Sequence, residues 1–427
     1  MQKLYQGNYV EGLFSFIDKS PSPFHAIETM KGMLTEAGFI EVMENKSWSL
    51  EKGGSYFVVR NDSAIIAFQI PEKDMAGFHM VASHSDSPSF KIKENAELTL
   101  DKAYTKLNVE KYGGMIMSSW FDRPLSVAGR VYVNTEHGIE KRMIHFDEDL
   151  LVIPNLAIHM NREVNNGVKY SAQTDMCPVL STSADKEQFR KLLADKTDVD
   201  ADNILGQDLY LYTRQPGIVI GTEQDMIMSP RLDDLECAYG SMQALMESTS
   251  DRFVNICAVL DNEEVGSGTR QGADSDFLYS TLKRIIYAMG GNEETYMQAV
   301  AESFLISADN AHAIHPNHPE KADPTNRPVL NGGIVIKYSG NQKYTSDAFS
   351  GSVMKKLCMD ADVPYQVFYN HSDVLGGSTL GNISTAHVSV ASVDIGLPQL
   401  AMHSAVETAG VKDVEYLVKA LKEFYKL

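Results

Sequence analysis

The residues with the clearest chemistry are Asp261-Asn262-Glu263-Glu264, which follow the apolar run at 254–260. The run predicts a buried strand, and such a strand has no structural need for two adjacent carboxylates at its end. A metal centre explains them, because one carboxylate can bind a divalent cation while the other takes a proton from water. The pair therefore predicts a metal-dependent hydrolase, with Glu264 as a ligand and Glu263 as the general base.

Other potential ligands occur at His84-Ser85-Asp86, Asp233-Asp234, Asp309-Asn310 and His403, mostly directly after apolar runs. In α/β proteins, sites form where the carboxyl ends of strands meet. Taken singly, each residue has an ordinary explanation, such as an aspartate in the first turn of a helix or a buried histidine. Together they favour a metal site, and Asp86 is placed to accept the other ring N–H of His84.

A role follows for each ligand. Two cations that share a site need one bridging carboxylate and further ligands of their own. Asp233 is the predicted bridge, His84 and Asp309 complete one cation, and Glu264 and His403 complete the other. Imidazole and carboxylate ligands without thiolate suit zinc, and cobalt or manganese would also be accepted. We expect two divalent metal ions per subunit.

The elements that must position these residues alternate between helix and strand. Helical patterns begin at Ser22-Pro23 and Ser229-Pro230, and others cover 276–289 and 414–425. Strands are predicted at 56–59, 64–70, 77–83, 254–260, 303–308, 363–369 and 386–394. This rhythm predicts an α/β fold with a central mixed sheet flanked by helices, formed by residues 1–92 and 223–427.

The texture changes over residues 93–222, where short β-branched and aromatic segments recur between turn signals. Strands are expected at 107–109, 115–117, 128–133, 142–146 and 209–212, and one helix near 185–196. This pattern predicts an inserted β-rich domain.

Composition restricts the partners and the compartment. The net charge of −19 argues against nucleic acid or an anionic membrane surface as a partner. The four cysteines are far apart and form no CxxC pair, which favours buried thiols in a reducing compartment. No basic segment followed by an apolar one begins the chain, and no apolar stretch approaches the length of a membrane span. We expect a cytoplasmic protein.

The order of these motifs resembles the aspartyl aminopeptidase family of metallo-aminopeptidases. The matching segments are residues 84–88, 120–125, 230–235, 261–267, 307–317 and 399–404. The resemblance implies a zinc exopeptidase domain of the α/β type, interrupted by a β-rich dimerisation domain at 93–222. It also implies peptide substrates and homo-oligomers, namely dodecamers built from dimers.

Two further roles are implied by the resemblance alone. His159, at the end of Pro154-Asn155-Leu156-Ala157-Ile158-His159, matches a family histidine that reaches a neighbouring subunit's active site. Lys337 matches a family lysine near the acidic side chain of the substrate. The segment 370–379 lacks the arginine that aspartyl enzymes carry there and has His371 nearby, which opens a broader specificity than Asp or Glu.

Two alternatives use the same residues. A related metal-dependent deacylase or carboxypeptidase would share the ligands but would cleave N-acyl amino acids. A metal-bound scaffold without enzymatic activity would keep the ligands and make no use of Glu263. The leading interpretation is an aminopeptidase that removes N-terminal residues from peptides.

Overall fold

The computed structural model describes residues 9–185, 187–249, 251–374, 376–377 and 379–427. Contacts divide the chain into two compact units. The first comprises the chain up to Asp86, Gly217–Met402 and Glu407–Leu427, and the second comprises Ser87–Pro216 and His403–Val406.

A nine-stranded mixed sheet forms the centre of the first unit. In spatial order its strands are β1 (Ile40–Glu41), β2 (Ser55–Arg60), β3 (Ala64–Gln69), β13 (Phe253–Leu260), β4 (Gly77–His84), β14 (Phe304–Ala308), β18 (Ala391–Gly396), β16 (Ile334–Lys337) and β17 (Tyr365–Phe368). Strand β4 pairs in parallel with β13 and with β14, whereas β3 and β16 run antiparallel to their central neighbours. The carboxyl ends of β4, β13 and β14 therefore meet at one edge of the sheet.

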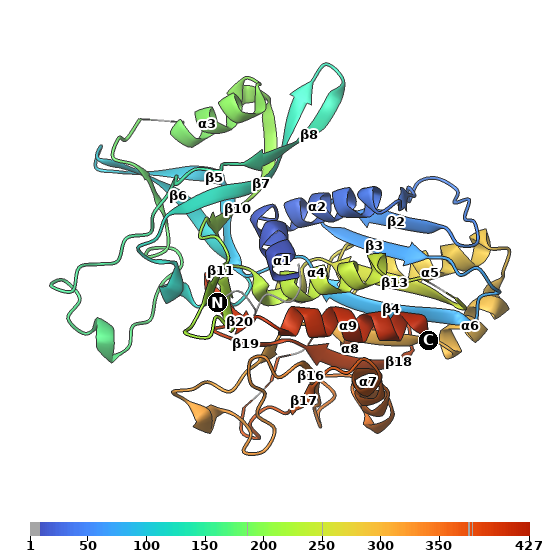
Figure 1. Ribbon diagram of the computed structural model, residues 1–427. Helices are drawn as coiled ribbons and strands as arrows, with labels where there is room; N and C mark the ends of the chain where they lie inside the picture. Colours follow the sequence, from blue (N-terminus) through green and yellow to red (C-terminus); the bar gives the residue numbers. More distant parts are fainter. Residues whose placement is uncertain (1–8, 186, 250, 375, 378) are drawn as a thin grey trace. The chain divides into compact units, whose positions relative to one another are not determined.

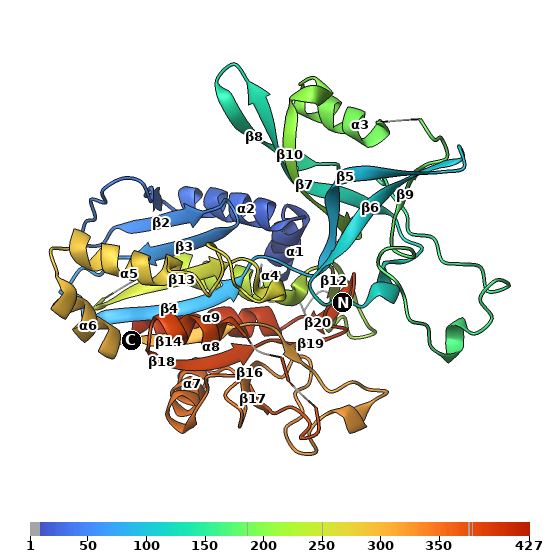
Figure 2. The same ribbon diagram turned by 180° about the vertical axis from the view of Figure 1, so that it is seen from behind.

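Helices cover both faces of this sheet. One face packs against α1 (Tyr9–Asp18), α2 (Pro23–Glu36), α4 (Leu232–Met246), α7 (Ala348–Asp360) and α9 (Asp413–Lys426) (Figure 1). The other face packs against α5 (Phe277–Ala288), α6 (Glu293–Ala301) and the start of α8 (Leu380–His387) (Figure 2). Within β3, Ile65 and Ala67 enter the first core while Ile66 and Phe68 enter the second, as a strand buried on both faces requires. This architecture confirms the predicted α/β fold.

Local signals in the sequence account for the first elements. Ser22 caps α2 in an extended conformation and accepts a hydrogen bond from the backbone N–H of His25, and Pro23 opens the helix. Asn61 and Asp62 both adopt positive φ between β2 and β3, which is the conformation that a tight turn demands. The predicted helix and hairpin are confirmed.

A second, five-stranded sheet in the first unit carries residues that flank the predicted ligands. Its order is β11 (Ile218–Ile220), β12 (Met226–Ser229), β20 (Glu407–Gly410), β19 (Pro398–Leu400) and β15 (Ala311–His312). Strand β12 leads into α4, and β15 begins two residues after Asp309. The small sheet thus holds the chain just before α4 and just after the end of β14.

The second unit is built on a six-stranded antiparallel sheet. Its order is β8 (Gly138–His145), β7 (Leu125–Thr135), β10 (Ile204–Thr213), β5 (Ser89–Leu100), β6 (Tyr104–Tyr112) and β9 (Val179–Ser181), and α3 (Gln188–Thr197) adds Phe189 to its core. Gly129 in β7 has φ 150°, and a Cβ there would lie 2.0 Å from the Asp208 carbonyl oxygen. Only glycine fits at this position in the pairing of β7 with β10.

Two predicted strands are wrong in part. Residues 115–117 form no strand but lead into a 3-10 helix, η1 (Met117–Trp120), because the Ser119 hydroxyl and N–H both bond the Ile116 carbonyl. The segment expected as a strand at 386–394 begins as the end of α8, and β18 starts only at Ala391. Leu380 and Ile383 lie at helical spacing and pack into the core, so tertiary burial decides in favour of the helix.

Among the residues that the structure describes, no helix has the length and apolar character that crossing a membrane requires.

Candidate metal centre

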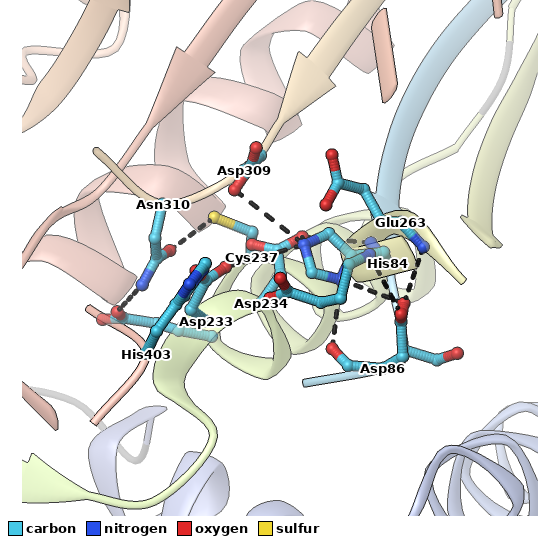
Figure 3. A network of polar contacts seen from close by, with 12 residues as sticks. His84, Asp86, Asp233, Asp234, Cys237, Glu263, Asp309, Asn310 and His403 are labelled. Atoms are coloured by element: carbon cyan, nitrogen blue, oxygen red, sulfur yellow. Dashed lines mark hydrogen bonds and ion pairs between the residues drawn. The ribbon is translucent and has the colours of Figure 1, made fainter. Parts of the chain in front are cut away.

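Three strand ends of the large sheet bring predicted ligands together. His84 is the last residue of β4 and pairs with Leu260, the last residue of β13. Asp309 directly follows β14, which lies on the other side of β4. Figure 3 shows the side chains of His84, Asp233, Asp234 and Asp309 directed toward one another. Parallel pairing therefore produces the convergence that the sequence predicts.

The distances between the side chains of this group are short. His84 Nε2 lies 3.6 Å from Asp233 Oδ1, 3.9 Å from Asp309 Oδ1 and 4.0 Å from Asp234 Oδ2. One ligand atom from each of the four residues lies within 4.8 Å of all the others. His84, Asp233 and Asp234 are at most 3% exposed. Three carboxylates buried around one imidazole fit a divalent cation, since buried charges are stable only when neutralised.

The start of α4 holds Asp233 and Asp234 in a non-helical conformation. The peptide bond between them is cis, and the regular helix continues from Leu235. The backbone N–H of Asp233 donates to Glu407 Oε2 at 3.0 Å. Oδ2 of Asp234 accepts the backbone N–H of His84 at 3.0 Å. Glu407 thus holds the backbone of Asp233, whose φ and ψ are not those of a residue in the first turn of a helix.

Glu263 and Glu264 lie in η4 (Glu263–Val265), a short 3-10 turn beyond β13. Asn262 adopts φ 62° and turns the chain back toward the edge of the sheet. Ligand atoms of His84, Glu263 and Glu264 lie within 4.8 Å of one another. The two carboxylates therefore join the same edge of the sheet as His84.

Asp86 contacts both sides of this centre. His84 Nδ1 lies 3.1 Å from the Asp86 carbonyl oxygen and 3.3 Å from Asp86 Oδ1. Nδ1 therefore carries the proton, and Nε2 is left facing the aspartates as a ligand atom. The carboxylate of Asp86 also accepts the backbone N–H groups of Glu263 at 3.1 Å and of Glu264 at 3.2 Å.

The pKa values of the site residues are shifted because several acids are buried close together. Burial raises the pKa of Asp234 well above its ordinary value, and the neighbouring carboxylates add to this effect. For His84, burial lowers the pKa, but the charges of Asp234, Asp233 and Asp309 prevail and hold it well above the usual value. Burial raises the pKa of Glu263 to about 8. A cation would relieve this repulsion.

Lys337 is buried in the structure. Its Nζ donates to the Asn310 carbonyl oxygen at 2.9 Å and lies 3.6 Å from Asp309 Oδ2. Only 3% of the residue is exposed. Its ammonium group thus contacts a predicted ligand.

Two predicted residues belong to the second unit. His403 follows Met402 of the first unit, has φ 66°, and shares a 2.7 Å hydrogen bond between its Nδ1 and the Gly114 carbonyl oxygen. His159 lies in an exposed turn within the second unit. The first unit by itself brings together His84, Asp233, Asp309, Glu263 and Glu264.

Several buried polar residues of the site were given no role in the sequence analysis. Asp234 lies in the ligand group itself, and Glu407 holds Asp233. Asn310 donates to Glu236 Oε2 at 3.2 Å and to Gln399 Oε1 at 2.9 Å, and it accepts from Cys237 Sγ. Burial raises the pKa of Glu236 well above its usual value. The pairs Asp233-Asp234 and Asp309-Asn310 signalled two of these residues, whereas Glu236 and Glu407 gave no signal because they meet the site only in the fold.

Similarity to known proteins identifies the family of this chain. Residues 16–425 match the family model described as aminopeptidase I zinc metalloprotease (M18). The chain belongs to the M18 family of metallo-aminopeptidases. It is therefore a metal-dependent hydrolase of the aminopeptidase class, and the deacylase alternative is not favoured.

Particular relatives are similar over nearly the whole chain. A protein of Clostridium novyi named as a probable M18 family aminopeptidase 2 is 46% identical, over 98% of this chain and 99% of its own. A relative of the same name from Ectopseudomonas mendocina is 41% identical, over 97% of each chain. Among solved structures, the chain resembles one in a cryo-EM structure of the Ape4 and Nbr1 complex, with TM-score 0.94 and 35% identity over 98% of this chain and 85% of that one.

Proposed function

We propose that this aminopeptidase works with two divalent cations that share Asp233. His84 and Asp309 hold one, and Glu264 and His403 hold the other. The convergence of His84, Asp233 and Asp309 within 4.8 Å is the observation that carries the proposal. For His403 the support is its place in the sequence motif at 399–404, directly after β19 and Ala401-Met402. Zinc is the metal that the family description favours.

Glu263 is the proposed general base. When bound, divalent cations in such a site lower the pKa of water and stabilise negative charge on the carbonyl oxygen under attack. Glu263 takes the proton from the attacking water and passes it to the leaving amine. Its backbone is held by Asp86 and its side chain lies near His84, so it remains beside the ligands without being needed as one.

The proposed preference for the N-terminal residue that is released rests on the family resemblance. Acidic residues, Asp or Glu, are the proposed preference, and the altered segment 370–379 allows a broader one. The resemblance places Lys337 near the acidic side chain. Because its Nζ already contacts Asn310 and Asp309, we give it a different task, which is to position Asp309.

Assembly is the second part of the proposal. One solved structure similar to this chain, at 25% identity and TM-score 0.85, is titled as an mApe1 dodecamer of S. cerevesiae. By analogy we propose a homo-oligomer, a dodecamer built from dimers, with the second unit as the dimerisation domain. His159, exposed on that unit, would then reach the site of a neighbouring subunit. The four buried free cysteines favour a cytoplasmic location.

The test is a panel of peptides that differ only in the N-terminal residue. Hydrolysis is measured on the full chain as purified, after chelation, and after addition of zinc, cobalt or manganese. We expect activity to vanish on chelation, to return with metal, and to be absent when the N-terminal amine is acetylated. Cleavage of the acetylated peptides in place of the free ones would contradict the proposal and support the deacylase alternative.

A further inference from the structure

Asn310 lies between Asp309 and β15, where the backbone is held closely against β18. The N–H of Asp309 donates to the Ile395 carbonyl oxygen at 3.1 Å. A Cβ at Gly396 would lie 2.1 Å from the Asp309 carbonyl oxygen, so only glycine lets the two segments come this close. The backbone that presents Asp309 is therefore fixed to β18.

The side chain of Asn310 reaches the first regular turn of α4. Its Oδ1 accepts a hydrogen bond from Cys237 Sγ at 2.9 Å, and its Nδ2 donates to Glu236 Oε2 at 3.2 Å. Figure 3 shows the Asn310 side chain directed at Cys237. Glu236 comes three residues after Asp233, so the amide contacts the helix directly beyond the proposed bridging ligand.

Two further strands are joined through the same residue. The Nδ2 of Asn310 also donates to Gln399 Oε1 at 2.9 Å, and Gln399 lies on β19. From β16, Lys337 Nζ donates to the Asn310 carbonyl oxygen at 2.9 Å. One residue thus links α4, β16 and β19 to the end of β14.

The Asn310 amide is buried and fully used. Asn310, Glu236, Cys237 and Gln399 are at most 2% exposed. An asparagine side chain has two N–H donors and one oxygen, and each of these has a partner here. The reverse orientation of the amide would point its oxygen at the Glu236 carboxylate, so the network fixes which way the amide faces. A buried polar link of this kind specifies one arrangement of the elements that it joins.

The polar character of this link calls for a reason beyond stability. The Glu236 carboxylate is buried near other acids, namely Asp233, Glu407 and Asp413. Apolar side chains of similar size would be less costly to bury at such a place. Hydrogen bonds add direction, because they restrict distances and angles that apolar contacts leave free. Metal ligands need that precision, since residues that orient them control the affinity for the cation.

We propose that Asn310 is a positioning residue of the metal centre. Its amide fixes the first turn of α4 relative to the end of β14, and thereby sets the separation between Asp233 and Asp309. The inference rests on the proposed two-cation function, because it concerns the cation that His84, Asp233 and Asp309 hold. Loss of the amide weakens the binding of that cation more than the binding of the other.

The test measures zinc binding to the full chain, which is first stripped of metal by a chelator and then titrated with zinc in a calorimeter. Asn310→Leu keeps the approximate size of the side chain and removes all of its hydrogen bonds. We expect one zinc equivalent to bind about 10–100-fold more weakly in this variant, which is the usual effect of removing a residue that orients a metal ligand.

Asn255→Leu is the matched control. Asn255 is a fully buried amide near the start of β13, whose other end leads to the metal centre, and its Nδ2 donates to the Tyr425 carbonyl oxygen at 3.0 Å. Its removal lowers the Tm of the zinc-free protein and leaves the affinity for zinc unchanged. Equal losses of zinc affinity in the two variants would show that Asn310 acts only through overall stability.

A double variant separates positioning from stability. Glu236 Oε1 has no hydrogen-bond partner among the described residues, so Asn310→Leu leaves the carboxylate without its bond to the amide. Adding Glu236→Met removes that carboxylate, and the Tm of the zinc-free protein recovers, because apolar partners of similar shape can replace a buried polar pair. Zinc affinity stays low, since the link between α4 and β14 is still missing. This variant decides the question if Asn310→Leu alone does not fold.

The proposal is overturned if Asn310→Leu binds both zinc equivalents as the natural protein does, or if the double variant regains Tm and zinc affinity together. Two equivalents in the natural protein keep the two-cation function standing under either result. A natural protein that binds only one equivalent refutes that function instead, and the affinity of this equivalent in Asn310→Leu then decides the role of Asn310. Absence of any zinc binding refutes both.

Discussion

Oδ1 of Asp86 accepts a hydrogen bond from the backbone N–H of Glu263 at 3.1 Å. The same carboxylate accepts from Glu264 and lies 3.3 Å from Nδ1 of His84. One fully buried side chain thus fixes a predicted ligand and the predicted base relative to each other. Its position two residues after His84 explains how it can reach both, because the chain turns at the end of β4.

Asp86→Asn should slow the reaction while most of the metal stays bound. An amide offers one acceptor where two backbone N–H groups need one each, and the lost or repelled contact costs about 1–3 kcal/mol. We expect a fall of about 10–100-fold in kcat, measured together with metal content by elemental analysis. An unchanged kcat would show that the turn holding Glu263 needs no help from Asp86.

Glu263→Gln should abolish proton transfer and little else. The substitution keeps the size of the side chain and removes its ability to accept a proton, so kcat is expected to fall by about 10²–10⁴-fold. Metal content and oligomeric state should be unchanged, and Glu264→Gln is the matched variant that should lose metal. The assignment of the base fails if activity persists in a protein with a full complement of metal.

Lys337→Met should impair acidic and neutral substrates equally. The buried ammonium lies 3.6 Å from Asp309 Oδ2, and its removal leaves that carboxylate without the positive charge of Lys337. Breaking such a buried pair costs about 3–5 kcal/mol, which should appear as a lower Tm and a lower metal affinity. Lys343→Met, at an exposed position, is the control. A selective loss of Glu peptides alone would instead make Lys337 the reader of the substrate charge.

Asp394 should hold Thr345 and Thr379 of the first unit in place. Its Oδ1 accepts a hydrogen bond from Thr379 Oγ1, and its Oδ2 accepts from the N–H and the hydroxyl of Thr345. Thr345 lies in the segment after β16, and Thr379 lies in the segment after β17. Thr379→Val removes one hydroxyl and should lower Tm and raise KM, whereas Thr379→Ser retains it and should resemble the natural protein. Equal KM values for the two variants would argue against this link.

His79 should make stability depend on pH. Burial lowers the pKa of His79 to about 4, and its ring stacks on Phe253 with centroids 3.9 Å apart. The unfolded chain then binds a proton that the folded protein does not, so stability increases as pH rises from about 4 to about 6.5, by about 3 kcal/mol in total.

The measurement is urea unfolding at pH 5 and pH 7.5 for the natural protein and for His79→Phe, which keeps the ring stack. The variant should lose less stability at the lower pH. Groups such as Asp413, whose pKa is raised to about 7 by burial, contribute equally to both proteins and cancel in the comparison. Identical changes in the two proteins would show that His79 does not titrate in this range.

Local patterns predicted much of the fold. Apolar runs located β3, β4 and β13, and Ser22-Pro23 located α2, because burial on both faces and helix capping leave direct traces in sequence. The strand expected at 115–117 failed because a serine hydroxyl closes a turn there, an interaction that hydrophobic periodicity does not report. The strand predicted at residues 386–387 is wrong because packing favours a helix there.

The site followed the same rule. His84, Asp233, Asp309 and Glu264 could be expected to lie together because each stands next to a strand or at a helix start, and parallel pairing aligns such positions. Glu236 and Glu407 were missed because their partners are distant in sequence. The contacts of Asp86 with two backbone N–H groups depend on the shape of a turn, and no residue type in the sequence predicts that shape.

The chain visits the second unit twice, first for Ser87–Pro216 and again for the four residues His403–Val406. The short second segment is part of that unit's structure, since Ala405 packs in its core and the Ala405 N–H donates to Ser119 Oγ at 2.8 Å. A gene segment that encodes residues 87–216 alone therefore lacks part of its own interior. A transplant of the second unit into another protein therefore needs both segments, 87–216 and 403–406.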